Sequence, residues 1–171
     1  KIVKSDLEQI LDTRVDVSFF HREPEELFFD FKEYTLLEDD ESVEDIFFSE
    51  YSEAPSLLDE STGCGGEIKV CSHLLRSNCK ITKQPDWGSI YIRMKASNLP
   101  GDASLLKYIV SLRSENHFHE EICEMIYKRL WDKFKPEILA ITCIYTRRGG
   151  IDICPSRANQ IEYLPEFILD P

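Results

Sequence analysis

The sequence lacks a long apolar run and any large cluster of basic residues, and both absences narrow the possible functions. No stretch approaches the ~20 consecutive apolar residues that a membrane-spanning helix needs, so no transmembrane helix is predicted. Lys and Arg number 20 against 32 Asp and Glu, which gives a formal net charge of −12. Because binding to phosphate backbones relies on clustered cations, we expect neither nucleic acid nor a membrane as a partner.

The sequence also lacks a CxxC pair. Its six cysteines lie at positions 64, 71, 79, 123, 143 and 154 and form no compact disulfide framework. A chain of 171 residues, 42% of them hydrophobic, can bury a core without such staples. We therefore expect reduced thiols and a cytoplasmic location, with most of the cysteines serving as small core residues.

The first 37 residues show an open order of elements. Helical spacing over residues 1–12, alternation over 15–19 and β-favouring aromatics over 27–37 predict a helix followed by two strands. This order matches the last three elements of the unit described below, and the chain starts at Lys1 instead of Met. We expect residues 1–37 to be the C-terminal part of a first module, in a tandem duplication whose front half lies upstream.

An acidic, irregular segment follows over residues 38–62. It could serve as an acidic docking segment. Runs of like charge usually stay in water, however, so we expect a solvated linker in which Phe47, Phe48 and Tyr51 pack down.

Residues 63–171 are predicted to form a second, complete module, since the glycines around residue 65 mark a boundary. The periodicity predicts the order β-β-α-α-β-β, with strands at 68–75, 90–95, 138–146 and 151–155 and helices at 102–112 and 117–135. Two strands joined without a helix imply antiparallel pairing. The fold class is therefore α+β, an antiparallel four-stranded sheet with two helices on one face.

Cys79 and Asp86 are the first candidates for chemistry, because a Gln-Pro loop separates them between two strands. A thiol and a carboxyl at one rim of a sheet suit a nucleophile and a proton donor. Each residue also fits a structural role, Cys79 as a strand-end thiol and Asp86 as a turn-capping carboxylate. From the residues alone the two interpretations are evenly balanced.

Two further clusters carry polar groups. His119 and Glu120 fall in the first turn of the second helix, where a carboxylate either favours the helix dipole or accepts paired hydrogen bonds from an N–H-rich heterocycle. Arg148 and Gly149, in an Arg-Arg-Gly-Gly turn, suit an anionic cofactor or form an ordinary hairpin loop. A zinc site built from histidines and cysteines is a weaker alternative, in which Cys71 and His73 are expected to share one face of a strand.

Four motifs, in this order, resemble one known family: SHLLRSNC at 72–79, QPDWGS at 84–89, FHE at 118–120 and YTRRGGIDI at 145–153. They are similar to those of the 7-cyano-7-deazaguanine reductases of queuosine biosynthesis, nitrile reductases of the tunnelling-fold (T-fold) superfamily. The resemblance spans about residues 63–160 and, with the acidic run, is closer to the two-module form of the family.

The resemblance implies a T-fold module and a set of roles. Cys79 would add to the nitrile carbon to give a covalent thioimide, and Asp86 would protonate the nitrile nitrogen. His119 and Glu120 would contact the substrate, and Arg148 and Gly149 would bind NADPH. A homo-oligomer, at least a dimer, is expected, because T-fold barrels form by joining sheets.

One departure from the family pattern stands out. The family also has a Glu-Ser-Lys motif that contributes to substrate and cofactor binding, and this sequence lacks it. In two-module members the motif lies in the first half, upstream of Lys1. Weak binding by this chain alone is therefore expected, and two alternatives stay open: a non-catalytic T-fold fragment that binds or assembles, and a zinc-dependent pterin-type T-fold enzyme.

Overall fold

The computed structural model describes residues 1–17, 31–61, 63 and 65–165. The chain divides into two compact units, one of residues 1–29 with 167–171 and one of residues 30–166. Among the described residues, none of the helices combines the length and the apolar character that a membrane crossing requires.

The first unit is represented by helix α1, Ile2–Leu11, which confirms the predicted helix. It ends where Asp12 adopts the left-handed conformation, with φ of 49°. Its apolar side chains are exposed, Ile2 at 77% and Ile10 at 78%. The strand predicted at 15–19 is wrong over residues 15–17, which are irregular; its last two residues lie outside the described part.

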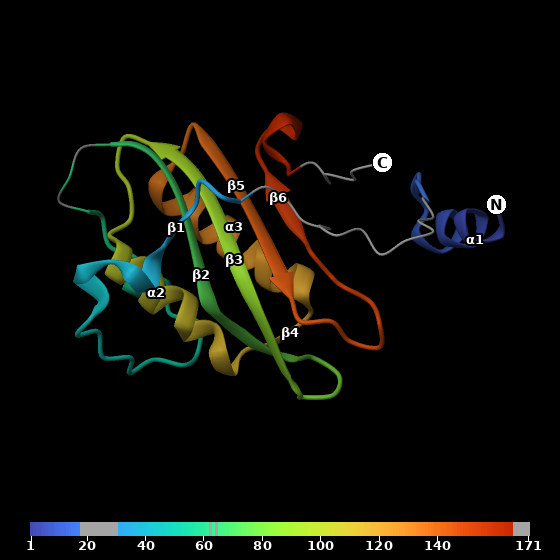
Figure 1. Cartoon of the computed structure of the whole chain (residues 1–171), viewed down its shortest axis with the longest axis horizontal. Helices are drawn as coiled ribbons and strands as arrows, with labels where there is room; N and C mark the ends of the chain where they lie inside the picture. The colour runs from blue at the N-terminus through green and yellow to red at the C-terminus, as the bar shows by residue number, and fades with distance from the viewer. Residues whose placement is uncertain (18–30, 62, 64, 166–171) are drawn as a thin grey trace. The chain divides into compact units, whose positions relative to one another are not determined.

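The second unit is built on one mixed sheet (Figure 1). Its long strands are β2 (Gly66–Cys79), β3 (Pro85–Ala96) and β5 (Ile138–Tyr145), which pair antiparallel in that order. The short strand β6 (Ser156–Ala158) adds an antiparallel edge to β5. These four strands confirm the predicted antiparallel sheet, although its last strand begins at 156, after Pro155, instead of at 151.

Two short strands pair with β2 in parallel and were not predicted as such. Strand β1 (Thr35–Leu36) pairs with Val70 and Cys71. Of the strand predicted at 27–37, residues 27–30 lie outside the described part and only Thr35–Leu36 is a strand. The prediction is wrong over residues 31–34, which contain a turn, and at Leu37, where a 3-10 helix begins. Strand β4 (Asn116–His117) pairs with the other end of β2, at Asn78 and Cys79.

Helices α2 (Asp102–Ser111) and α3 (His119–Phe134) lie on the same face of the sheet, as predicted (Figure 1). Their apolar stripes face the strands, because the residues at helical spacing are the ones that are buried. The core between helices and sheet includes Leu75, Ile90, Ile92, Met94, Leu105, Ile109, Ile122, Ile126, Leu130 and Ile141. Turns of 3-10 helix complete the unit: η1 (Leu37–Asp39), η2 (Glu41–Val43), η3 (Pro55–Leu57), η4 (Leu112–Ser114) and η5 (Ile161–Tyr163).

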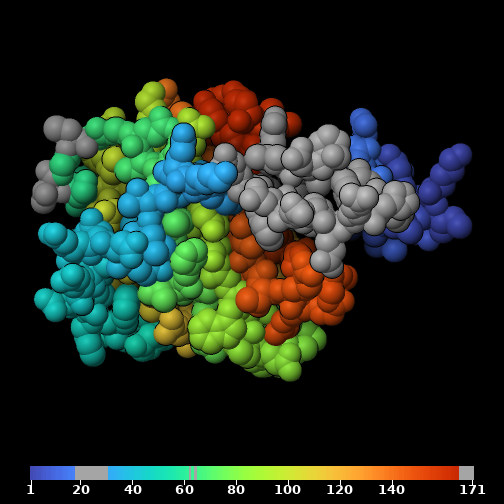
Figure 2. Space-filling view, in the orientation of Figure 1, coloured from blue at the N-terminus to red at the C-terminus, as the bar shows by residue number. Residues whose placement is uncertain are grey.

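The described part of the acidic segment, residues 38–61, covers one side of this unit (cyan to teal in Figure 2). Leu58 is buried, at 1% exposure, whereas Phe47 is 82% exposed, so the expectation that Phe47 packs down is wrong. The Glu53 carboxylate accepts two hydrogen bonds from Arg129 of α3, at 2.7 and 3.0 Å. The acidic segment is thus attached to α3 in part by this ion pair.

Candidate active site

The β2–β3 hairpin places Cys79 and Asp86 at the same end of the sheet. The Cys79 N–H donates to the Gln84 carbonyl at 2.8 Å, and the Lys83 N–H donates to the Cys79 carbonyl at 2.9 Å. Lys83 adopts a φ of 58°, which closes the loop after Cys79. Two positions further along the register, Ser77 pairs with Asp86. The strand-loop-strand geometry predicted around the Gln-Pro pair is therefore confirmed.

The Cys79 thiol is held in an environment that favours its anion. The Thr82 N–H points to Cys79 Sγ at 3.5 Å. Hydrogen bonding from the Thr82 side chain, with smaller contributions from the backbone of Thr82 and Ile81, lowers the pKa of Cys79 to about 7. The nearby negative charge of Asp86 acts in the opposite direction. About half of this thiol is therefore ionised at neutral pH, against a few per cent for an ordinary cysteine.

Asp86 is a buried carboxylate with two cationic or potentially cationic neighbours. Its exposure is 3%. His119 Nε2 lies 3.3 Å from Oδ2, and Arg148 Nε lies 3.0 Å from Oδ1. The Arg148 contact is an ion pair that lacks hydrogen-bond geometry, since Oδ1 has no hydrogen-bond partner in the described structure. Burial of this carboxylate is compensated by charge rather than by a full set of hydrogen bonds.

Strand β4 explains how His119 reaches Asp86. The pairing of His117 with Cys79 aligns the residues just before α3 with the end of β2. The helix then begins at His119, with the Phe118 N–H donating to the Glu121 carboxylate at 2.8 Å. The His119 ring stacks on Tyr145 of β5, at a centroid distance of 4.0 Å. His119 is thereby fixed between the helix start, the β5 strand and Asp86.

Arg148 comes from the turn after β5. The Thr146 N–H donates to the Trp87 carbonyl at 2.8 Å, which keeps this turn beside β3. Gly149 and Gly150 have φ values of 58° and 82°, which favour glycine. The Arg148 Nη2 donates to the Pro85 carbonyl at 3.3 Å, next to Asp86. The sequence indicated a cofactor role for Arg148, and its contact with Asp86 was not foreseen.

The structure brings some of the predicted site residues together and leaves others apart. Cys79, Asp86, His119 and Arg148 converge at one end of the sheet. Glu120 follows His119 in the first turn of α3 and is exposed. Thr82, Ser77 and Tyr145 were not predicted as site residues. For Tyr145 the sequence does hold a signal, because alternation along β5 places it on the same side of the strand as the buried Cys143.

The zinc alternative gains no support from the described geometry. A register shift in β2 between Ser72 and Leu75 breaks the strand alternation. Cys71 is consequently buried and His73 exposed, so the expectation that they share one face is wrong. Within the described ranges, no group of three or more potential ligand side chains comes together. Cys64 lies outside them.

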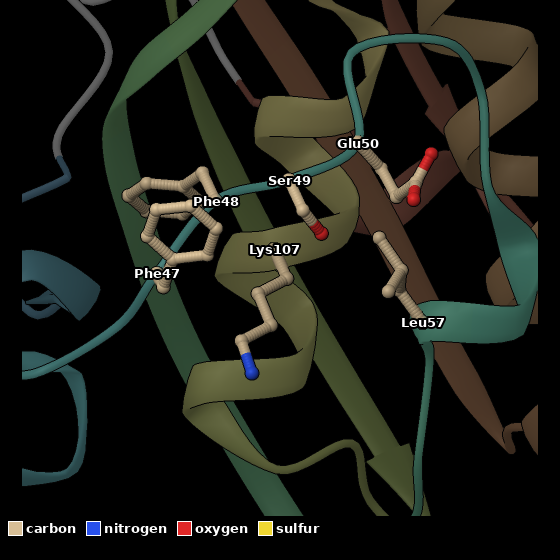
Figure 3. Close-up of a pocket in the computed structure, with 6 residues that line it drawn as sticks. All are labelled: Phe47, Phe48, Ser49, Glu50, Leu57 and Lys107. Atoms are coloured by element: carbon tan, nitrogen blue, oxygen red, sulfur yellow. The ribbon is translucent and has the colours of Figure 1, made fainter.

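Two surface hollows are lined by neither Cys79 nor Asp86. A small one of about 80 Å³ sits between the acidic segment and Lys107 of α2, with Phe47, Phe48, Ser49, Glu50 and Leu57 (Figure 3). Its lining offers no nucleophile of lowered pKa. A larger groove, about 610 Å³, runs along α3 beside the site and is lined by His117, Glu121, Glu124, Met125, Tyr127, Lys128 and Arg157.

This chain is similar to known proteins over part of its length. A family model described as QueF-like protein matches residues 85–163. The NADPH-dependent 7-cyano-7-deazaguanine reductase of Acinetobacter baumannii (strain SDF) is 48% identical over 111 residues, which cover 65% of this chain and 40% of that protein. The protein of the same name from Colwellia psychrerythraea is 46% identical over 126 residues, covering 71% of this chain and 44% of that protein.

The chain therefore spans about two fifths of the length of these relatives. A solved structure, the archaeosine synthase QueF-Like in the apo form, aligns with a TM-score of 0.48 and 15% identity, over 57% of this chain and 95% of that chain. The α+β architecture is evident from the strands and helices themselves, without this comparison.

Proposed function

We propose that this chain carries the catalytic part of an NADPH-dependent 7-cyano-7-deazaguanine reductase of queuosine biosynthesis, because residues 85–163 match the model of the QueF-like family. Its reaction would reduce the nitrile of 7-cyano-7-deazaguanine to the aminomethyl group of 7-aminomethyl-7-deazaguanine. The observation that carries the proposal is a thiol of pKa about 7, Cys79, beside a buried Asp86–His119 pair. An activated nucleophile next to a proton donor is what addition to a nitrile requires.

Cys79 supplies the first step. Its thiolate sulfur attacks the nitrile carbon, a carbon–sulfur bond forms, and one π bond of the nitrile breaks toward nitrogen. The hydrogen bonds from Thr82 keep a large fraction of the thiol ionised, so the attack needs no separate base at neutral pH. The product is a thioimide bound covalently to Cys79.

The Asp86–His119 pair supplies the proton. A nitrile is a weak electrophile, and its developing nitrogen anion must be protonated as sulfur attacks. The protonated form of Asp86, held 3.3 Å from His119 Nε2, delivers that proton to nitrogen. Because the carboxyl is 3% exposed, bulk water does not replace it as the donor.

The turn at Arg148 fits an anionic dinucleotide. A Cβ built on Gly149 or Gly150 meets nothing within 4 Å, so a ligand can approach this backbone closely. The Arg148 side chain is 36% exposed and keeps donors that are not used on Asp86 or Pro85. When bound, NADPH would supply a hydride to the substrate carbon, and complete reduction of the nitrile would consume two NADPH molecules. Arg148 and Gly149 would hold it by charge and by backbone contact.

Glu120 is proposed to recognise the base. Its exposed carboxylate offers two acceptor oxygens in one plane, which match adjacent N–H donors of a deazaguanine edge. It follows His119 in the same helical turn, so recognition of the base and protonation of the nitrile would be fixed to each other by α3.

The organisation of the chain is proposed along the same lines. Residues 1–37 would end a first T-fold module, residues 38–62 would link it, and residues 63–171 would form the catalytic module. The described sheet ends at the short strand β6, and an edge strand favours joining to another sheet in a homo-oligomer. In the absence of the Glu-Ser-Lys motif, a binding or assembly fragment is the second candidate.

Incubation with 7-cyano-7-deazaguanine tests the proposal without the cofactor. Intact-mass spectrometry should show one covalent adduct, absent in Cys79→Ala and slowed in Asp86→Asn. No adduct at saturating substrate would refute the proposal for this chain. If the adduct forms, consumption of added NADPH separates a complete reductase from a fragment that binds but does not turn over.

A further inference from the structure

Three buried polar atoms near Asp86 have no hydrogen-bond partner in the described structure: Ser77 Oγ, Tyr145 Oη and Asp86 Oδ1. Ser77 is 0% exposed, and Tyr145 and Asp86 are each 3% exposed. An unpartnered buried polar atom is costly, so such atoms are rare in folded proteins. The mechanism above uses neither hydroxyl.

The strand register places the three side chains on one face of the sheet. Ser77 of β2 lies directly opposite Asp86 of β3, and directly opposed residues of an antiparallel pair point to the same side. Tyr145 of β5 lies opposite Gly88, which is two residues beyond Asp86 on β3. Since alternate residues share a face, Tyr145 is on the side of Ser77 and Asp86.

Gly88 provides the room that Tyr145 needs. A Cβ built on Gly88 would meet the Tyr145 ring carbon Cδ1 at 3.0 Å and the Ile144 carbonyl at 2.8 Å. The ring therefore lies across the strand where a side chain would otherwise stand. This brings the phenol within hydrogen-bonding reach of Ser77 and under the influence of the Asp86 charge. Burial raises the pKa of Tyr145, so its phenol stays protonated and remains a donor.

We propose that Tyr145 and Ser77 are positioning residues that form a hydroxyl chain to Asp86 when the site is loaded. Small rotations let the Tyr145 phenol donate to Ser77 Oγ and the Ser77 hydroxyl donate to Asp86 Oδ1. With Oδ1 held as an acceptor, the transferable proton of Asp86 is confined to Oδ2, the oxygen that faces His119 Nε2. The inference rests on the proposed function, because it assigns how that site holds its proton.

Tyr145→Phe and Ser77→Ala test it in the full chain. At saturating 7-cyano-7-deazaguanine, each should slow thioimide formation by about tenfold, the loss expected for one hydrogen bond. The substrate concentration for half-saturation should stay unchanged, since neither residue contacts the base in this proposal. The double variant should be no slower than either single one, because removing either hydroxyl breaks the same chain.

Stability separates positioning from a structural role. Because the two hydroxyls have no partner in the described fold, Tyr145→Phe should melt at the wild-type temperature or above. Tyr108→Phe is the matched control. Tyr108 is equally buried, but its hydroxyl lies 3.3 Å from Glu53, so its loss should lower the melting temperature and leave the rate of adduct formation unchanged.

A second readout does not depend on the reaction. With 7-cyano-7-deazaguanine present at saturation, the ¹⁵N NMR signal of His119 Nε2 reports its contact with Asp86, and it should shift in Ser77→Ala and not in Tyr108→Phe. An unshifted signal, or additive rate losses that accompany unfolding, would overturn the inference. If the wild-type chain forms no adduct, the proposed function fails while the NMR comparison still decides whether the hydroxyl chain holds Asp86.

Discussion

Removal of the Thr82 hydroxyl should make Cys79 less ionised at neutral pH but more reactive in alkali. Hydrogen bonding by the Thr82 side chain is the largest cause of the lowered pKa of Cys79, about 7 against an ordinary value of 9.0. Thr82→Val keeps the branched shape and the backbone N–H, so only the contribution of the hydroxyl is lost. The pKa of Cys79 should rise part of the way back.

The size of the effect follows from two opposing factors. At pH 7 a thiol of pKa about 7 is about half ionised. A rise of one unit leaves about a tenth ionised, which is about fivefold less. The more basic thiolate is, however, about threefold more nucleophilic for each unit of pKa. Alkylation at pH 7 should therefore slow only about twofold, whereas above pH 9 the variant should react about threefold faster than wild type.

The assay is the rate of carbamidomethylation of the Cys79 peptide by iodoacetamide, followed by mass spectrometry from pH 5 to 10. Thr82→Ser is the matched control, because it retains the hydroxyl and should keep a midpoint near 7. Curves for Thr82→Val and wild type that superimpose over the whole range, with no crossing, would show that the hydroxyl does not set the pKa of Cys79.

Three further predictions concern the surroundings of the site. Glu53→Gln should destabilise the fold by about 1–2 kcal/mol at pH 7 in urea titrations. Because Arg129 lowers the pKa of Glu53, the stabilisation from this carboxylate is present above about pH 4.5 and is lost as pH falls through the folded pKa. The difference in stability between Glu53→Gln and wild type should therefore vanish at lower pH. Gly88→Ala should cost about 1–3 kcal/mol, measured the same way, since its Cβ would meet the Ile144 carbonyl at 2.8 Å; unchanged stability would contradict the crowding. Arg148→Gln should weaken NADPH binding about tenfold by calorimetry, and Arg147→Gln, whose guanidinium is engaged by Asp152, should change it less.

The parts of the fold that were predictable are those set by local patterns. The β2–β3 hairpin follows from a proline loop between alternating runs, and α2 and α3 follow from apolar residues at helical spacing. Strands β1 and β4 are only two residues long, and no periodicity can develop in so few positions. Their pairing with β2 depends on the tertiary structure, which brings their backbone N–H and C=O groups beside those of β2.

The same distinction applies to the site. Cys79, Asp86 and His119 carry recognisable chemistry and lie in motifs, so the sequence identifies them. The activation of Cys79 by Thr82 depends on the left-handed turn at Lys83, which no sequence pattern announces. The contact of Arg148 with Asp86 depends on how the β5 strand lies against β3, a tertiary relation between residues 62 positions apart in the chain.

Arg148 contacts Asp86 and is also proposed to bind NADPH, and its guanidinium has enough donors for both roles. Its Nε lies at Asp86 Oδ1 and its Nη2 donates to Pro85, which leaves both N–H groups of Nη1 for another acceptor. The side chain is partly exposed and is followed by two glycines in the left-handed region, so an anion can reach Nη1 without displacing Asp86. A cofactor phosphate bound there would draw charge from the guanidinium and weaken its hold on Oδ1. That oxygen would then be free to accept the Ser77 hydroxyl, so binding at the turn and completion of the hydroxyl chain would favour each other.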